Sequence, residues 1–596
     1  MRALAVTAVV VYHLDPDRLP GGFLGVDVFF VLSGFLITDL LLAEHRANGT
    51  VGLGAFWAGR ARRLLPPLLV VLVASTAAAV LIRPTRATDA RGFVLSALTF
   101  TNNWWQTLTD ASYFASSGPP PLFMHLWTLS VEEQFYLVWP PLLLALLAGV
   151  RVPARRAHPA HAAHPARLTR LTRRTHRTRF LLLVPLGLAA VSAAAMWLLH
   201  VPDTDSSRLY FGTDTHAFPL LIGAALALAQ PAAGLAAGFS RRVEYAAFAG
   251  IAVLGGCAWT ADGTSDALYP CGFLLASAAA AAVVLGAVQT RGPFVGALSA
   301  APLRWLGKRS YGIYLWHLPA LSLAVPDDRT AADAPLNSLA AAAISVVLGA
   351  LSYRWIEEPV RHQGLRVVSC RLRAALAGPA PVRSPARWGA CGLALAAAVA
   401  VGLTAWGVAA PPPGDSAADR VEAGQRALDE APSPSGASVR VGMSAIGDSV
   451  MVASAPALKA RFPGMVIDAK TSRQLSAAAA EVRSLKAAGT LGDTVVIGLG
   501  TNGVGGRDDL ESAVREAGPG ERIVLVTAHV PKSWQIQVNR AIAAVAEAHP
   551  NVAVADWDKA ITGREALLAG DHVHPGPRGG RVYADTVGAA LASFAP

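Results

Sequence analysis

Residues 23–43, FLGVDVFFVLSGFLITDLLLA, form an apolar stretch long enough to cross a bilayer. A helix of about 20 apolar residues spans the roughly 30 Å of hydrocarbon in a membrane. Ten similar windows bring the total between residues 1 and 410 to eleven: 1–14, 64–83, 126–149, 180–200, 215–230, 244–262, 268–288, 310–325, 337–357 and 389–410. The sequence therefore predicts a polytopic α-helical membrane domain of about ten helices, followed by one connecting span.

The composition agrees with a membrane protein. Of the 596 residues, 53% are hydrophobic and 15% are charged, whereas roughly 25% are charged in ordinary soluble domains. This excludes a wholly soluble, disordered or fibrous protein. The four cysteines have neither the paired spacing of a zinc site nor the density of a disulfide scaffold, so we expect no structural metal and no redox centre.

The positive charge is distributed unevenly between the loops. The net charge is +11, and alternate loops hold 25 Lys or Arg on one side against 5 on the other. Because cytoplasmic loops carry the excess of basic residues, the richer side is predicted to be cytoplasmic, together with the N-terminus. An odd number of spans then places the chain after residue 410 outside the cell. The charge thus indicates topology in a lipid bilayer, and we expect no nucleic-acid partner.

The first window, residues 1–14, is shorter than a span. It lacks the cleavage site of a signal peptide and runs directly into the next window. We therefore expect that the native chain begins upstream of Met1.

A different pattern follows the last window. Residues 411–440 are rich in Pro, Ser, Ala and Gly, which predicts a flexible linker. Beyond it, short apolar runs at 441–446, 494–499, 522–527 and 552–555 alternate with helical stretches at 451–462, 473–488, 535–548 and 577–593. Such alternation predicts an α/β domain with a parallel sheet between two layers of helices, over residues 441–596.

Ionisable residues inside apolar windows are costly and are functional or paired by default. Arg2 and His13 bracket ten residues of the first window, and Glu132 and Glu133 interrupt the fourth. His13 is suited to act as a general base at neutral pH; the alternative is a structural histidine bonded to a neighbouring helix. Since adjacent helical residues point about 100° apart, the two glutamates cannot both face one site, and one of them is a candidate to orient His13.

Several segments together resemble the acyltransferase family 3 membrane proteins. They are RALAVTAVVVYH, GGFLGVDVFFVLSGFLIT, FWAGRARRLLPPLL, NNWW, DASYFASSGPPPLFMHLWTLSVEEQFYLVWP, YFGTDTHAF, PLRWLGKRSYGIYLWHLP and SYRWIEEPVR. These matches run in order across residues 1–361, which leaves 362–410 as a basic cytoplasmic loop and one additional transmembrane helix.

The resemblance implies a function for the membrane domain. It implies that His13 is essential for moving an acetyl or other short acyl group from cytoplasmic acyl-coenzyme A to a carbohydrate. Arg2, Arg60, Arg62 and Arg63 are then candidates to bind the coenzyme, because guanidinium groups match phosphate oxygens. The alternative for the last three is that they merely anchor the cytoplasmic side. His216 stands where the family usually has Arg, so the role of that Arg is in doubt here.

Polar motifs follow the predicted strands of the outer domain. Ser449 lies in a Gly-Asp-Ser turn before a helix, Asn502 follows GLGT, and Asp571 precedes His574 by three residues. A hydroxyl, an imidazole, a carboxylate and an amide donor are the inventory for nucleophilic acyl transfer.

This set resembles the SGNH hydrolase family. The resemblance implies Ser449 as nucleophile, Asn502 in the oxyanion hole, and Asp571 with His574, rather than His572, as the acid–base pair. The family's oxyanion glycine falls on Ser472, which would be strained if that position needs a positive φ. The alternative is a degenerate domain that only binds glycan.

These observations predict a membrane O-acyltransferase that moves an acyl group from acyl-coenzyme A to a cell-envelope carbohydrate, with the outer domain performing the final transfer. Two alternatives remain: an extracytoplasmic carbohydrate esterase tethered to a membrane domain, and a multi-span transporter. The acceptor sugar, the acyl length and the oligomeric state are left open.

Overall fold

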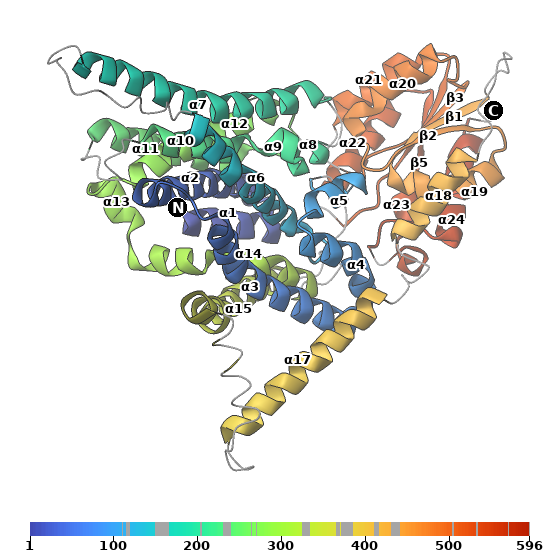
Figure 1. The fold of residues 1–596 in the computed structure, drawn as a ribbon. Helices are drawn as coiled ribbons and strands as arrows, with labels where there is room; N and C mark the ends of the chain where they lie inside the picture. The colour runs from blue at the N-terminus through green and yellow to red at the C-terminus, as the bar shows by residue number, and fades with distance from the viewer. Residues whose placement is uncertain are drawn as a thin grey trace.

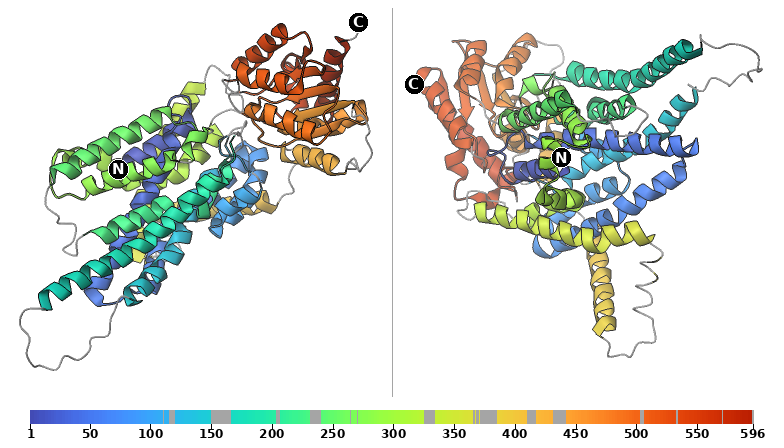
Figure 2. Two further views of the ribbon diagram at one scale, coloured as in Figure 1. Left: turned by 90° about the horizontal axis from the view of Figure 1, so that it is seen from above. Right: turned by 90° about the vertical axis from the view of Figure 1, so that its left-hand side faces the viewer.

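The computed structural model describes residues 1–109, 111–114, 120–149, 166–202, 206–230, 240–263, 265–269, 271–324, 334–364, 367, 370, 385–409, 417–430, 442–502, 506–531, 534–569 and 571–594. The chain forms a helical part followed by a part built on one sheet, and the two lie side by side (Figure 1 and Figure 2).

The first elements of the helical part range in length from a three-residue turn to a 34-residue helix. They are α1 (Arg2–Leu14), η1 (Gly22–Leu24), α2 (Gly25–Asn48), α3 (Leu53–Ile82), α4 (Pro84–Leu98), α5 (Asn102–Leu108), η2 (Met124–Leu126), α6 (Trp127–Gly149) and α7 (Ala166–Leu199). The remaining elements are α8 (Ser207–Phe211), α9 (Thr213–His216), α10 (Phe218–Ala229), α11 (Arg241–Thr260), η3 (Asp266–Leu268), α12 (Gly272–Ala287), α13 (Pro293–Leu298), α14 (Ala301–Ala324), α15 (Ala334–Ser352), the π-helical turn η4 (Tyr353–Glu357) and α17 (Pro385–Ala409).

Each of the eleven predicted windows coincides with a helix. Six helical segments of the described chain are long and apolar enough to cross a membrane: Gly22–Asn48, Leu53–Ile82, Met124–Ala148, Leu181–Leu199, Arg241–Thr260 and Leu336–Gly364. Four shorter apolar helices cover further windows, at Arg2–Leu14, Thr213–Ala229, Gly272–Ala287 and Ala394–Ala409. The window at 310–325 overlaps α14, which ends at Ala324. The helical membrane fold is thus confirmed, while the number of crossings stays a prediction.

Helix α1 packs against α2 and α14. The approach to α2 is close, because a Cβ on Gly25 would lie 2.5 Å from the backbone oxygen of Ala5. The helix is continuous from Arg2 to Leu14, so the Cα atoms of Arg2 and His13 lie about 16 Å apart along its axis.

The sheet part contains five parallel strands in the order β2-β1-β3-β4-β5. The strands are β1 (Met443–Gly447), β2 (Val466–Ala469), β3 (Thr494–Gly498), β4 (Arg522–Val526) and β5 (Val552–Ala555). The helices are α18 (Ala417–Asp429), α19 (Ser449–Arg461), η5 (Leu475–Ala477), α20 (Ala478–Ala487), α21 (Arg507–Ala517), α22 (Gln535–Ala548), α23 (Trp557–Ile561), η6 (Glu565–Leu567) and α24 (Pro577–Ala592).

The sheet separates two hydrophobic cores. Ile446, Ile497 and Leu525 pack on one face with α20, α21 and α22, and the intervening residues Ala445 and Val496 pack on the other face with α19, α23 and α24. Figure 1 shows these two helical layers on either side of the strands. The three-layer α/β fold predicted from the sequence is confirmed. The chain passes from β1 to β2 on one side and then crosses back to β3 on the other side of β1. Ligands of such sheets bind at the carboxyl ends of the strands where the order reverses.

The structure differs from the prediction in the segment 411–440. Within it, residues 417–429 form helix α18, which packs on α19. This part of the expected flexible linker is therefore an ordered component of the sheet part. The sequence also gave no sign of strand β2, a four-residue edge strand whose residues are only half buried.

Candidate functional sites

A pocket in the helical part gathers three of the predicted arginines. It encloses about 720 Å³ of space, including its open mouth. Arg2 enters it from α1, and Arg60 and Arg63 enter it from α3. Within the described chain, no carboxylate forms an ion pair with these three guanidinium groups. The lining is completed by Val26, Phe29, Phe30, Ser33, Leu64, Thr128, Leu129, Glu132, Tyr136, Ser310, Tyr311, Tyr314 and Leu315.

Two further predicted residues, Arg62 and Glu132, differ in their position relative to this pocket. Arg62 is exposed, does not line the pocket, and donates from Nε to the backbone oxygen of Ala58 at 3.0 Å. Glu132 faces the pocket and accepts hydrogen bonds from Ser33 Oγ (2.8 Å) and the Tyr136 hydroxyl (3.2 Å).

Glu133 points away from the pocket lining, as the 100° spacing of adjacent helical residues requires. Neither Glu132 nor Glu133 has a hydrogen bond to His13 in the described chain. The expectation that one of them orients His13 stays a prediction, because no direct hydrogen bond between the described residues supports it.

His13 instead belongs to a buried cluster of aromatic side chains. Its Nδ1–H donates to the Val9 carbonyl at 2.8 Å, which leaves Nε2 as the acceptor for the Tyr113 hydroxyl at 3.2 Å. His317 Nε2 lies 3.3 Å from His13 Nδ1, and the rings of His317 and His125 are 4.9 Å apart.

Tyr314 joins this cluster to the arginine pocket, whose lining does not include His13, His125 or His317. Tyr314 lines the pocket, and its backbone oxygen accepts a hydrogen bond from His317 Nδ1 at 2.5 Å. The Tyr314 hydroxyl donates to the backbone oxygen of His125 at 2.9 Å. Tyr113 and Tyr314 were missed at the sequence level, because tyrosine is uncharged and unremarkable in an apolar span.

His216, at the position where the resemblance led us to expect arginine, is paired with an aspartate. Its Nε2 lies 3.1 Å from Asp27 Oδ1, and both side chains are 0% exposed. The other ring nitrogen donates to the backbone oxygen of Tyr210 at 2.8 Å. The histidine therefore links α9 to the start of α2, across 189 residues of sequence.

In the sheet part, Ser449 is the first residue of α19, directly beyond the carboxyl end of β1. Asp448 caps this helix by accepting from the backbone N–H of Val450 at 3.0 Å. Its other oxygen accepts from the backbone N–H of Thr501 at 3.3 Å. Asp448 therefore ties the loop of Ser449 to the loop that carries Asn502, at the point where the strand order reverses.

His574 and Asp571 form a close pair. His574 Nδ1 donates to Asp571 Oδ2 at 2.5 Å, and Asp571 Oδ1 accepts from the backbone N–H groups of Val573 (3.0 Å) and His574 (3.1 Å). Burial lowers the pKa of His574, but the charge and hydrogen bond of Asp571 outweigh burial and hold that pKa above its ordinary value. Burial likewise raises the pKa of Asp571, and His574 outweighs it, so the net pKa of Asp571 is lowered.

The remaining imidazole nitrogen, His574 Nε2, is buried without a hydrogen-bond partner among the described residues. No hydrogen bond joins it to Ser449 Oγ in this part of the chain. Such catalytic contacts are often long before substrate binds. His572 has no part in the Asp571 pair, in agreement with the choice of His574 from the family spacing.

Ser472 has a φ of 60°, the strained conformation anticipated if this position needs glycine. The loop is held by Arg473, which donates to the backbone oxygen of Asp468 at 2.6 Å and to its carboxylate at 2.8 Å. Asn502 Nδ2 donates to the backbone oxygen of Arg473 at 3.3 Å. The backbone of Ser472 and the amide of Asn502 thus belong to one connected loop pair.

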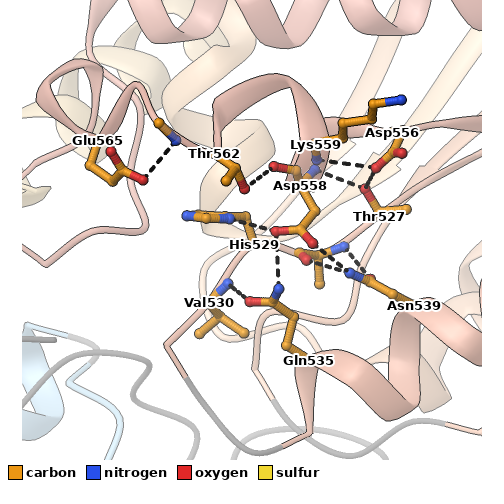
Figure 3. A network of polar contacts seen from close by, with 12 residues as sticks. Thr527, His529, Val530, Gln535, Asn539, Asp556, Asp558, Lys559, Thr562 and Glu565 are labelled. Carbon is orange, nitrogen blue, oxygen red and sulfur yellow. Dashed lines mark hydrogen bonds and ion pairs between the residues drawn. The ribbon is translucent and has the colours of Figure 1, made fainter. Parts of the chain in front are cut away.

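The sheet part holds another histidine–aspartate pair, which lies beyond β4 and was not predicted (Figure 3). His529 Nδ1 donates to Asp558 Oδ1 at 2.6 Å, and Gln535 donates to the same oxygen at 3.0 Å. Asn539 accepts from the backbone N–H of Ala528 at 2.8 Å. The network fastens the loop after β4 to α22 and α23. The sequence feature that could have indicated this pair is His529, two residues after the apolar run at 522–527.

Comparison with known proteins agrees with both parts of the chain. The acyltransferase domain family model matches residues 1–354. The peptidoglycan O-acetyltransferase OatA of Listeria monocytogenes is 32% identical over 627 aligned positions, which cover 98% of this chain and 96% of that protein. The putative peptidoglycan O-acetyltransferase YrhL of Bacillus subtilis is 31% identical, covering 100% and 98% respectively.

Two further proteins are similar to this chain. The O-acetyltransferase OatA of Staphylococcus aureus is 30% identical, over 98% of this chain and 94% of its own. The solved C-terminal catalytic domain of Streptococcus pneumoniae peptidoglycan O-acetyltransferase A is 31% identical, covering 26% of this chain and 94% of that domain, with a TM-score of 0.24. The family match and the full-length relatives together show that the chain belongs to acyltransferase family 3, as a membrane O-acetyltransferase with a C-terminal SGNH hydrolase-like domain.

Proposed function

We propose that this protein transfers an acetyl group from cytoplasmic acyl-coenzyme A to a hydroxyl of a cell-envelope glycan. Two relatives of full length are named for peptidoglycan as the acceptor, and we propose the same acceptor here. The observation that carries the proposal is the Asp571–His574 pair, whose Nε2 is left for a substrate or for Ser449.

The arginine pocket is suited to the coenzyme. Arg2, Arg60 and Arg63 present three positive groups, none of which forms an ion pair with a carboxylate among the described residues, although Glu132 lines the same pocket. Guanidinium groups bind phosphate oxygens well. The apolar side of the pocket, with Phe29 and Phe30, suits an uncharged arm. When bound, the coenzyme would supply the acyl group as a thioester. Arg62 points away from the pocket, so we do not assign it to this role.

His13 is proposed as the general base of the membrane domain. The Val9 carbonyl fixes the proton on Nδ1, so Nε2 is the nitrogen that can take a proton from an attacking hydroxyl. His317 lies against the Nδ1 side, where it supports this tautomer. Burial in an apolar span keeps water from competing for the acyl group.

The outer domain is proposed to complete the acyl transfer in two steps. First, Ser449 Oγ attacks the acyl carbonyl and its proton passes to His574 Nε2, which returns it to the leaving group of the donor. Second, the glycan hydroxyl attacks the Ser449 ester, gives its proton to His574, and Ser449 leaves with that proton. Asn502 and the backbone N–H of Ser472 are proposed to stabilise the oxyanion.

The basic loops support an arrangement with the N-terminus in the cytoplasm and the sheet part outside. The donor pocket and Ser449 would then serve opposite sides of the membrane, which is the arrangement that a two-stage relay requires.

Mass spectrometry of cell-envelope glycans tests the proposal, in a strain lacking the protein and complemented with wild type, His13→Ala or Ser449→Ala. Loss of an O-acetyl group in the deletion and in both variants is expected. A gain of O-acetyl groups in the deletion would instead show an esterase. A normal product with Ser449→Ala would show that the outer domain is not the terminal transferase.

A further inference from the structure

Helix α18 connects the last apolar helix of the chain, α17, to the sheet part. It lies against α19, the helix that begins at Ser449 (Figure 1). Its composition suggested a linker, yet it makes specific contacts with two segments that bear proposed catalytic groups.

The first contact is with the Ser449 helix. A Cβ on Gly424 would lie 1.9 Å from the backbone oxygen of Val452, so the two helices touch through their backbones within the first turn after Ser449. Lys459, farther along α19, donates from Nζ to the backbone oxygen of Ala427. Residues at both ends of α19 thus hold α18 in one register.

The second contact is with the loop of His574. Arg420 Nη1 donates to the backbone oxygen of His574 at 2.8 Å and lies 3.5 Å from the backbone oxygen of Leu567. A Cβ on Gly576 would lie 3.1 Å from Arg420 Cζ, so the absence of a side chain there gives the guanidinium its place.

We propose that Arg420 is a positioning residue for His574, and that α18 fixes the Ser449 helix and the His574 loop relative to each other. This inference rests on the proposed function, in which Ser449 and His574 act together. The geometry of the acyl-transfer site would then depend on the segment that follows α17, so the membrane connection takes part in forming the site.

The charge of Arg420 gives the proposal a signature. The charged groups that act on His574 are Asp571 from its own loop, Asp448 from the turn after β1, and Arg420 from α18. The two carboxylates raise the pKa of His574, whereas the Arg420 guanidinium lowers it. Because the base must be neutral to accept a proton, loss of the Arg420 charge is expected to move the acidic limb of the activity profile to higher pH.

The experiment uses the full-length protein purified in detergent, with 4-nitrophenyl acetate as acyl donor. Initial rates are measured across pH for wild type, Arg420→Gln, Arg420→Lys, Gly576→Ala and Ser449→Ala. The matched control is Arg426→Gln, because Arg426 lies on the same helix, is exposed, and pairs only loosely with Glu422 at 3.9 Å.

We expect Arg420→Gln to lower kcat by roughly ten- to hundredfold, the range for a group misplaced by about 1 Å. KM should change little, and the acidic limb of the pH profile should move to higher pH. Arg420→Lys should recover part of kcat and keep the limb in place. Gly576→Ala, which displaces the guanidinium without removing its charge, should lower kcat and leave the limb where it is. Arg426→Gln should match wild type.

Two results would overturn the proposal. Wild-type rates for Arg420→Gln would show that the Arg420 contact does not position His574. An equal loss of kcat in Arg420→Gln and Arg420→Lys, with the acidic limb of the pH profile unchanged, would show that Arg420 contributes only to packing. Full activity of Ser449→Ala would be different, because it would refute the proposed function and the Arg420 role together. Loss with Ser449→Ala but not with Arg420→Gln would refute the Arg420 role alone.

Discussion

His574 and Asp571 are joined by a hydrogen bond of 2.5 Å between Nδ1 and Oδ2, and the same aspartate accepts two backbone N–H groups of its own loop. The four-residue segment 571–574 therefore contains both the base and the group that orients it. The carboxylate is held by the backbone, so the imidazole is fixed in the tautomer that leaves Nε2 as acceptor. This relationship determines how activity should respond to pH.

Asp571→Asn is expected to lower kcat by roughly 10⁴-fold, as for the equivalent loss in a serine protease triad. The pH profile should change as well. Asp571 raises the pKa of His574, so the acidic limb of wild type should lie above about 6.5, the ordinary histidine value. Without the carboxylate, the limb should move to lower pH. Rates of 4-nitrophenyl acetate turnover across pH measure both effects, and a limb that stays in place would contradict the assignment.

Ser472→Gly is expected to stabilise the sheet part without loss of activity. A non-glycine residue in the left-handed region destabilises the folded state by about 1–2 kcal/mol. Glycine removes this strain, but its greater freedom in the unfolded chain lowers the free energy of unfolding by about 0.5–1 kcal/mol. The net gain should raise the apparent thermal midpoint. Ser472→Val is the control, because a β-branched residue is less tolerant of a φ of 60° and should lower the midpoint. Equal thermal midpoints for Ser472→Gly and Ser472→Val would contradict backbone strain at Ser472.

These residues show how far the sequence can predict the site. The family spacing selected His574 over His572, and the glycine position raised the question of a positive φ at Ser472, because both are local properties. The partners of His13 could not be foreseen, since Tyr113 and His317 are 100 and 304 residues away. Helix α18 was missed because a Pro- and Ser-rich composition describes the whole segment, whereas its order depends on contacts with α19. Arg60, Arg62 and Arg63 were equivalent in sequence, and only the rotation of α3 separates them.

His13→Ala is expected to abolish acetylation of the glycan while sparing the outer domain. The variant removes the Nε2 acceptor but leaves α1 packed through Ala5 and Val9, which are buried. Glycan O-acetylation should fall to the level of the deletion strain, whereas turnover of 4-nitrophenyl acetate, which depends on Ser449, should stay at the wild-type rate. Loss of both activities would indicate misfolding, and retention of glycan acetylation would remove His13 from the mechanism.

The arginine pocket provides a prediction with an internal control. Arg63→Gln is expected to raise KM for acetyl-coenzyme A by roughly ten- to hundredfold, because a hydrogen bond between charged groups contributes about 1.5–3 kcal/mol. Arg62→Gln removes the same charge one position earlier on α3, where the side chain is exposed and outside the pocket, so it should leave KM near wild type. KM is measured by release of free coenzyme from protein in detergent. If the two variants raise KM equally, the arginines act only through their net charge, and the pocket is not the coenzyme site.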